Sequence, residues 1–151
     1  MPLLSVSHQQ QRQQADCLAA CAAMLLDYLH IPVRYSRLLS LLEVSAIGTS
    51  FGKLRNLETL GLSVRVEGGD IETLQGHLSQ GLPVIAFVDT GQLTTYWAEQ
   101  TDHAVVVVGI EGEFVYLNDP AFPSGPQMPP LREFELAWEE KDFLYGLIAL
   151  E

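Results

Sequence analysis

The sequence predicts an α+β domain, in which a helical first half precedes a second half dominated by β-strands. Ala- and Leu-rich segments with helical spacing lie before residue 61, whereas alternating and β-branched runs recur from residue 62 onward. Two of these runs are separated by a short Gly-containing turn, which favours an antiparallel sheet. Because 151 residues suffice for one core and no repeat or linker is visible, we expect a single domain over residues 1–151.

Composition and charge narrow the classes of function. The hydrophobic fraction of 48% and the charged fraction of 18% are typical of a globular protein. A net charge of −11 with only 8 lysines and arginines argues against nucleic-acid binding, which requires a cationic surface. No apolar run approaches the roughly 18 residues of a membrane span, and the Gln-rich start lacks a basic signal-peptide region. We therefore expect a cytoplasmic protein with no membrane span.

A helix is expected to begin at Cys17. Asp16 is a favoured helix N-cap residue, and the Ala- and Leu-rich residues that follow contain no strong helix breaker before Pro32. Two neighbouring apolar stripes of this helix are predicted to be buried. They comprise Leu18, Ala22, Leu25 and Leu29, and Cys17, Cys21, Met24 and Tyr28. Helical residues four apart are poorly placed for a disulfide, so we expect two free thiols, with Cys21 as a small core residue.

The remaining elements follow from periodicity and from Gly and Pro breakers. The first ten residues are expected to form an extended arm, with Leu3, Leu4 and Val6 at a sheet edge. Further helices are predicted at residues 36–43, 50–60, 71–80 and 132–139. Strands are predicted at residues 62–67, 83–88, 104–108, 114–117 and 143–150. Surface loops are expected at residues 90–101 and 120–130, and the second of these is Pro-rich and suited to flank a groove.

One hairpin has a direct bearing on function. The Ala-Val run at residues 104–108 is typical of a strand buried on both faces, and residues 114–117 return as its antiparallel partner. We place the turn at Glu111. His103 and Asp119 lie eight residues on either side of it, so the hairpin brings them together at its open end. A register that differs by one residue turns the two side chains to opposite faces.

Cys17 is the candidate nucleophile. In the first turn of a helix, unpaired backbone N–H groups and the positive end of the dipole favour a thiolate and lower a cysteine pKa, an effect that the adjacent Asp16 opposes. A cysteine peptidase also needs an imidazole to accept and return a proton, a group that orients it, and donors for the oxyanion. His103 and Asp119 fit the first two roles. Gln11, together with the Cys17 backbone N–H, fits the third.

Two further assignments rest on position. Gln11 lies six residues before Cys17, on the segment that leads into the helix, so its side-chain amide is expected to reach the same cavity. Four other glutamines between residues 9 and 14 offer the same group, and only spacing favours Gln11. Tyr96 and Trp97 are candidate substrate-binding residues, because exposed aromatic side chains on loops beside a site often bind ligands.

Three segments together resemble a known family. The run at residues 11–24 contains an Asp-Cys pair with a second Cys four residues later. Residues 103–109 read His-Ala-Val-Val-Val-Val-Gly, and residues 118–121 read Asn-Asp-Pro-Ala. This combination is similar to the papain-like cysteine peptidases that process bacteriocins at double-glycine leaders, and the resemblance covers nearly the whole chain. It implies a papain-like fold, with an N-terminal helical lobe that carries the nucleophile and a C-terminal antiparallel sheet.

The resemblance also implies the chemistry. It assigns the roles given above to Gln11, Cys17, His103 and Asp119, with no metal or cofactor and with a peptide or protein as substrate. The expected reaction is hydrolysis of a peptide bond through an acyl-enzyme, after a double-glycine-type leader. Members of this family usually carry Gly after the nucleophile, where this chain has Leu18. Members are often the first domain of an export ATPase, but these residues contain no ATP-binding loop. We expect a free-standing domain, with a domain trimmed from a longer protein as the alternative and a transporter as a candidate partner.

Three alternatives stay open at this point. A catalytically inactive papain-like module that binds peptides shares the fold, although such modules generally lack the cysteine that is present here as Cys17. A cysteine acyltransferase or amidase shares the acyl-enzyme step with a peptidase. A zinc site built from Cys17, Cys21 and two histidines is disfavoured, because no paired Cys or His motif of the structural-zinc type occurs.

Overall fold

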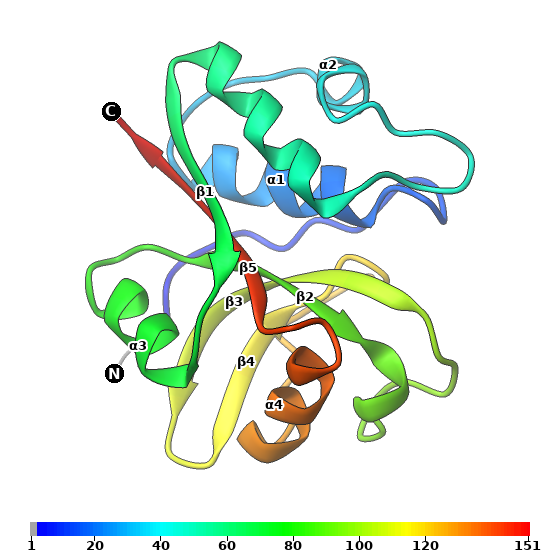
Figure 1. Cartoon of the computed structure of the whole chain (residues 1–151), viewed down its shortest axis with the longest axis vertical. Helices are drawn as coiled ribbons and strands as arrows, with labels where there is room; N and C mark the ends of the chain where they lie inside the picture. Colours follow the sequence, from blue (N-terminus) through cyan, green and yellow to red (C-terminus); the bar gives the residue numbers. More distant parts are fainter. Residues whose placement is uncertain (1–2) are drawn as a thin grey trace.

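The computed structural model describes residues 3–151, which form a five-stranded sheet and the helices that cover it (Figure 1). In chain order the elements are α1 (Cys17–Tyr28), α2 (Tyr35–Leu41), η1 (Phe51–Leu60), β1 (Leu62–Gly68), α3 (Ile71–Ser79), β2 (Val84–Asp89), η2 (Thr90–Gln92), β3 (Asp102–Glu111), β4 (Phe114–Asn118), α4 (Leu131–Glu139) and β5 (Leu144–Leu150). The strand order is β1-β5-β2-β3-β4, and every neighbouring pair is antiparallel. The predicted α+β class is therefore confirmed.

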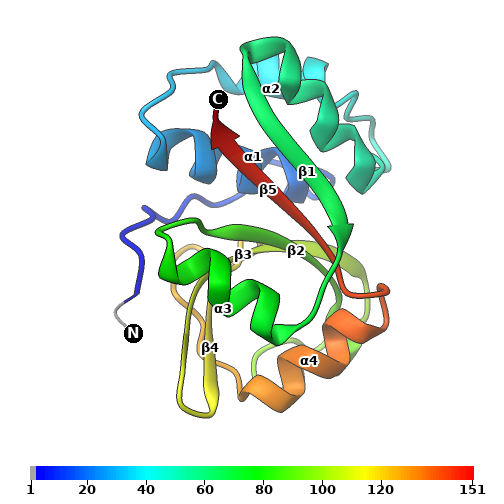
Figure 2. The ribbon, with the colours of Figure 1, turned by 60° about the vertical axis from the view of Figure 1, so that its left-hand side comes forward.

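Helices cover the sheet on both sides. The helices α1, α2 and η1 gather at one side, and α3 and α4 lie at the other, as the two views agree (Figures 1 and 2). Side chains alternate along β3, so that Val106 packs into the core beneath α1, whereas Val105 and Val107 pack into the core beneath α4. This strand is thus buried on both faces, as its Ala-Val run predicted.

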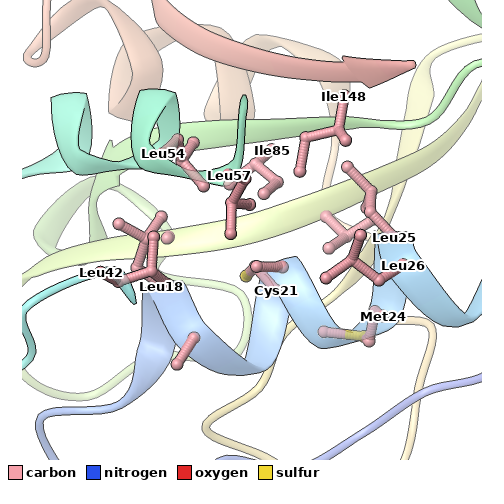
Figure 3. Packing of buried hydrophobic residues seen from close by; sticks show 14 of the residues in the cluster. Leu18, Cys21, Met24, Leu25, Leu26, Leu42, Leu54, Leu57, Ile85 and Ile148 are labelled. Atoms are coloured by element: carbon pink, nitrogen blue, oxygen red, sulfur yellow. The ribbon is translucent and has the colours of Figure 1, made fainter. Parts of the chain in front are cut away.

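The helix α1 begins at Cys17, as predicted, and both of its apolar stripes face the core. Leu18, Cys21, Met24 and Leu25 are buried in the core that also contains residues of η1, β2 and β5 (Figure 3). Leu29, at the end of the first stripe, is half-buried. This packing fixes the direction of the helix axis and therefore the place of its first residue.

The start of α1 differs from the prediction in one respect. Within the described residues, the Asp16 carboxylate makes no capping hydrogen bond to the first turn. The backbone of Asp16, with φ −94° and ψ 9°, is not in the extended conformation that aims an N-cap side chain at the helix. The carboxylate instead accepts a hydrogen bond of 3.1 Å from the Tyr35 hydroxyl, which joins the start of α1 to α2.

The other predicted elements are found within a few residues of their expected bounds. The segment η1 is a 3₁₀ helix, and it ends at Gly61, whose φ of 82° is left-handed and favours glycine. His77 of α3 is half-buried, and its Nε2 lies 3.1 Å from the Tyr145 hydroxyl oxygen. The Pro-rich loop was expected to flank a groove. Its Ala121 does line a cleft. Its last part pairs with β4, where Leu117 and Gln127 exchange two backbone hydrogen bonds, and so covers the edge of the sheet.

The β3–β4 hairpin contains an irregularity that determines on which face of the sheet the side chain of residue 119 lies. Glu111 pairs with Phe114, so the turn consists of Gly112 and Glu113 and is not centred on Glu111 as predicted. Between Val107 and Gly109 the register then shifts by one residue, which is a β-bulge. Beyond the bulge, Val106 pairs with Asn118. Continuing this register turns the side chain of residue 119 to the same face as that of residue 103.

The N-terminal arm is held along this hairpin. The Leu4 N–H donates to the Val108 carbonyl at 2.9 Å, at the bulge, which confirms the predicted edge pairing of the arm. Further along, the Asn118 side chain donates to the Val6 carbonyl at 3.0 Å, and His8 Nε2 lies 2.6 Å from the Phe122 carbonyl. Residues 1–2 of the expected arm lie outside the described residues.

None of the helices among residues 3–151 combines the length and the apolar character that crossing a membrane requires.

Candidate active site

Cys17 lies where two surface clefts meet. The lining of the first cleft, of about 400 Å³, includes Gln11, Cys17, Trp97 and His103. The second cleft, of about 420 Å³, is lined by Cys17, by Phe87 and by residues 46–49 of the loop that precedes η1. The Cys17 thiol is half-buried. A peptide that lies across both clefts therefore passes over the thiol.

A third cleft, of about 460 Å³, lies on the outer side of α3 and the β1–β5 pair. Its lining includes Arg65, Glu72 and His77 and none of the candidate catalytic residues. It lacks a cysteine among its lining residues, so a thiol-based site is centred on the first two clefts.

The hairpin brings His103 and Asp119 together. His103 is the second residue of β3, and Asp119 follows the last residue of β4. His103 Nε2 lies 2.6 Å from Asp119 Oδ1, within hydrogen-bonding distance. The two residues are only 4% and 0% exposed, which shields their interaction from water. With Nε2 directed to the carboxylate, Nδ1 is the ring nitrogen left to serve the thiol.

Asp119 is held by donors on both of its carboxylate oxygens. Oδ1 accepts from His103 and, at 3.0 Å, from the Ala121 N–H. Oδ2 accepts from the Tyr96 hydroxyl at 2.9 Å and from Trp97 Nε1 at 2.8 Å. Burial raises the pKa of Asp119, but the hydrogen bonds and the charge of His103 outweigh burial and hold the pKa below its ordinary value.

Tyr96 and Trp97 therefore do something that the sequence reasoning did not identify. Both were expected to contact substrate, yet both polar atoms are directed to Asp119. Trp97 also lines the first cleft, and its ring meets that of His103 edge-on at 5.0 Å between centroids. The residue types could have indicated this role, because the Tyr hydroxyl and the Trp indole N–H are donors that usually have a hydrogen-bond acceptor when they are buried.

The thiol and the imidazole influence each other. Burial raises the pKa of Cys17, but the hydrogen bond and charge of His103 outweigh burial, and the backbone of Ala104 and Leu18 adds to them, so the pKa is lowered. Burial lowers the pKa of His103, but Asp119 and Cys17 outweigh it and raise the pKa to about 9. Both shifts favour a thiolate beside an imidazolium over the neutral pair.

Asp16 is a buried carboxylate next to the nucleophile, with 3% of its surface exposed. Its partner is the Tyr35 hydroxyl, and the Arg12 guanidinium lies over the Tyr35 ring at 4.3 Å. Burial and the neighbouring Asp16 charge raise the pKa of Tyr35. The carboxylate is thus turned toward α2, which limits its opposition to a Cys17 thiolate.

Gln11 lies in the first cleft, as its spacing predicted, but its amide is already engaged. The side-chain Nε2 donates to the Gln13 and Gln14 carbonyls, at 2.9 Å each. Its backbone N–H donates to the Pro120 carbonyl at 2.8 Å, and Oε1 is buried without a partner among residues 3–151. Gln11 therefore stabilises the turn that leads into α1, because the Gln13 and Gln14 carbonyls precede the helix and have no partner within it. Service as an oxyanion donor requires it to release one of these bonds.

No group of three or more His, Cys, Asp or Glu side chains within residues 3–151 is arranged to hold a metal ion. The zinc site considered from the sequence is therefore not proposed.

Comparison with known proteins agrees with this geometry. The family model described as the Peptidase C39 family matches residues 5–144. The lactococcin-G-processing and transport ATP-binding protein LagD of Lactococcus lactis subsp. lactis is 30% identical over 129 residues. The match covers 85% of this chain and 17% of LagD, so the chain spans about a sixth of that relative's length.

Solved structures show the same fold. A C39-like peptidase from Bacillus anthracis has a TM-score of 0.81 at 20% identity, over 99% of this chain and 97% of that one. The peptidase domain of Streptococcus ComA, a bifunctional ABC transporter, gives 0.78 at 20% identity, over 97% and 99%. A double-glycine-motif protease from an AMS/PCAT transporter, solved with the leader peptide, gives 0.74 at 21%, over 99% and 94%. The expected papain-like fold is confirmed, and the protein belongs to the Peptidase C39 family.

Proposed function

We propose that the protein is a cysteine peptidase in which Cys17 is the nucleophile, His103 the proton carrier and Asp119 the orienting group. The observation that carries the proposal is the buried 2.6 Å contact of His103 with Asp119, beside a half-buried thiol with a lowered pKa. A nucleophile, its base and an orienting carboxylate in series are what acyl transfer needs. Membership of a peptidase family supports the same reading.

The proposed reaction has two steps. The Cys17 thiolate attacks the substrate carbonyl carbon and forms a C–S bond. The C–N bond then breaks as the His103 imidazolium gives its proton to the leaving nitrogen. In the second step, neutral His103 takes a proton from water, which attacks the thioester, and the C–S bond breaks to restore thiolate and imidazolium. The acyl product leaves as a carboxylic acid, which releases its proton to water and becomes a carboxylate.

Oxyanion stabilisation is assigned to the start of α1. The first N–H groups of a helix have no intrahelical partner, so the Cys17 N–H is free to donate to an oxyanion formed at its own side chain. Gln11 is the second donor, after exchange of one of its bonds to the turn at residues 13–14.

We propose that the substrate is a peptide cleaved after a double-glycine-type leader. Two observations support this class: the similarity to LagD, which is named for lactococcin-G processing, and the fold shared with a double-glycine-motif protease solved with its leader peptide. Leu18, which stands where the family usually has Gly, is only 4% exposed and packs near Leu42 in the core (Figure 3). Its side chain is therefore directed mainly into the core, and its remaining surface lines the second cleft beside Cys17. The transporter named in these relatives is a candidate partner of this chain.

The first test is the rate of alkylation of Cys17 against pH, read by mass spectrometry, with buried Cys21 as an internal reference. An activated Cys17 reacts with an apparent pKa well below about 8.5, and the effect disappears in His103→Ala. Burial raises the pKa of Cys21 well above its ordinary value, so it stays inert. An ordinary Cys17 pKa overturns the catalytic assignment.

The second test separates the possible products. Incubation with a peptide that contains Gly-Gly, with Cys17→Ala as the control, is expected to give two fragments whose new carboxyl terminus is the second Gly. Fragments joined to an added amine in preference to water indicate an acyltransferase. Binding of the peptide with an activated thiol but without cleavage contradicts the proposed substrate class.

A further inference from the structure

A segment between β2 and β3 carries both aromatic side chains that hold Asp119. This segment, residues 90–101, is closed at its base, where the Thr90 N–H donates to the Thr101 carbonyl at 3.0 Å. Within it, the N–H of Trp97 donates to the Leu93 carbonyl at 2.9 Å, and Leu93 is fully buried. The positions of Tyr96 and Trp97 therefore depend on what holds the turn at residues 93–97.

Glu133, in the first turn of α4, holds that turn from the outside. Its Oε1 accepts three hydrogen bonds: from Thr94 Oγ1 at 2.9 Å, from the Thr95 N–H at 3.1 Å and from Thr95 Oγ1 at 2.9 Å. Its Oε2 is buried and has no partner among residues 3–151. An oxygen with three donors is a strong local anchor, because each bond to a charged acceptor is stronger than a neutral one.

The anchored turn lies between two carboxylates. Glu133 holds it at Thr94 and Thr95, and the next two residues donate to Asp119 Oδ2 at 2.9 and 2.8 Å. Glu133 and Asp119 are thus joined through one short piece of backbone. Release of the turn at Glu133 allows the aromatic pair to move away from Asp119 and uncovers the edge of the His103 ring.

We infer that Glu133 is a positioning residue for the catalytic pair, acting through Tyr96 and Trp97 on Asp119. This inference rests on the proposed function, since it concerns the same thiol and imidazole. Both pKa values in the pair are displaced by interactions that are strong only away from water. Exposure of the pair to water therefore lowers the pKa of His103 and raises the pKa of Cys17, each toward its ordinary value. The pH range in which the thiolate–imidazolium pair exists becomes narrower at both ends.

The test compares Glu133→Ala, Glu133→Gln and Glu139→Ala by alkylation of Cys17 against pH in the full chain. Glu133→Ala is expected to raise the apparent pKa of Cys17 by about half to one unit, which lowers its reaction rate below that pKa about three- to tenfold. Glu133→Gln keeps the accepting oxygen and replaces only the unpartnered one, so it is expected to retain most of the wild-type profile. Glu139 is exposed on the same helix, and its change is expected to have no effect.

Thermal melting shows whether Glu133→Ala folds. If it does not, a second variant tests the inference. Thr95→Val removes one donor to Glu133 and is expected to shift the profile in the same direction by a smaller amount. The double variant is expected to shift it no further than Glu133→Ala alone, because the two changes break one connection. An unchanged profile in folded Glu133→Ala, or equal shifts in Glu133→Ala and Glu139→Ala, refutes the inference. An ordinary Cys17 pKa in the wild-type chain refutes the proposed function instead.

Discussion

His103 is subject to opposing influences that leave it protonated where most histidines are neutral. Burial at 4% exposure disfavours its charge, but the Asp119 carboxylate and the Cys17 thiolate outweigh burial and raise its pKa to about 9. The same charge lowers the pKa of Cys17. Apparent pKa values in such a coupled system belong to the pair and not to either residue. The pH dependence of the reaction is therefore the direct test of this arrangement.

We expect a bell-shaped dependence of kcat/KM on pH. The rising limb follows formation of the thiolate, at a pH below the ordinary thiol pKa of about 8.5, and the falling limb follows loss of the His103 proton near pH 9. Activity is thus present below the raised pKa of His103 and above the lowered pKa of Cys17. Peptide cleavage measured from pH 5 to 10.5 checks this. A falling limb near the ordinary histidine value of about 6.5 contradicts it.

Replacement of Asp119 by Asn is expected to lower kcat/KM by on the order of 10²- to 10⁴-fold. The change removes the charge that supports the His103 proton, so the falling limb moves to lower pH. It also leaves Tyr96 and Trp97 with an uncharged group in place of the carboxylate that accepts from both. Glu113→Gln removes a carboxylate from the exposed hairpin turn and serves as the control. If Asp119→Asn keeps both the wild-type kcat/KM and the wild-type pH profile, the role proposed for Asp119 is wrong.

The β3–β4 hairpin shows how an element sets the site. The sequence reasoning placed the turn at Glu111 and concluded that residues 103 and 119 face the same side. That conclusion holds, but the turn is at Gly112 and Glu113 and the bulge near Val108 adds a second offset. Either displacement by itself would turn residue 119 to the opposite face, and together they return it to the face of residue 103. Without the bulge, the register of the turn would direct residue 119 to the opposite face from residue 103.

The bulge is also where the N-terminal arm rests, and Gly109 makes that approach possible. A Cβ built on Gly109 meets the end of the Leu3 side chain, so Gly109→Ala must displace it. We expect this change to destabilise the fold by at most about 1 kcal/mol, because the atom that must move is the end of a flexible side chain that is 37% exposed. Thermal unfolding measures the effect. In the double variant with Leu3→Ala part of the loss is expected to be recovered, because the clash is removed, and an equal loss in both variants rejects this contact.

At the scale of the molecule, the site lies at the junction of two cores. The core beneath α1 places the thiol, and the core beneath α4 places the strands and the segment that carry Asp119 and its aromatic partners. The imidazole at the start of β3 connects the two. A change in either core is therefore expected to alter the geometry of Cys17 and His103, because a displacement in a close-packed interior moves the neighbouring side chains.

The net charge of −11 is a property of the whole molecule with a measurable consequence. A negative surface draws cationic peptides toward the cleft and repels anionic ones, which changes association rates. At low salt we expect kcat/KM for a cationic peptide to exceed that for its anionic counterpart by on the order of 10-fold. The ratio is expected to fall toward one near 1 M salt, where the screening length is about 3 Å. A ratio that is independent of salt argues against steering.

The sequence by itself determined the class of fold and the main elements, and it supplied the three residues that we propose for the site. Periodicity of apolar residues is a local property, and it identified α1, the strands and the exposed and buried faces without knowledge of contacts. The start of α1 at Cys17 followed from the same local pattern. The resemblance carried by the segments around Cys17, His103 and Asp119 suggested the catalytic roles that we propose for them.

Only the tertiary structure decided how the carboxylates and amides are used. Asp16 bonds to Tyr35 and does not cap α1, Gln11 braces its own turn, and Tyr96 and Trp97 are turned to Asp119. The partners of Asp16, Tyr96 and Trp97 are distant in sequence, whereas those of Gln11 lie two and three residues along the chain. Polar side chains have several acceptors and donors within reach along the chain, and burial in the folded state selects one, because a buried polar group without a partner is costly.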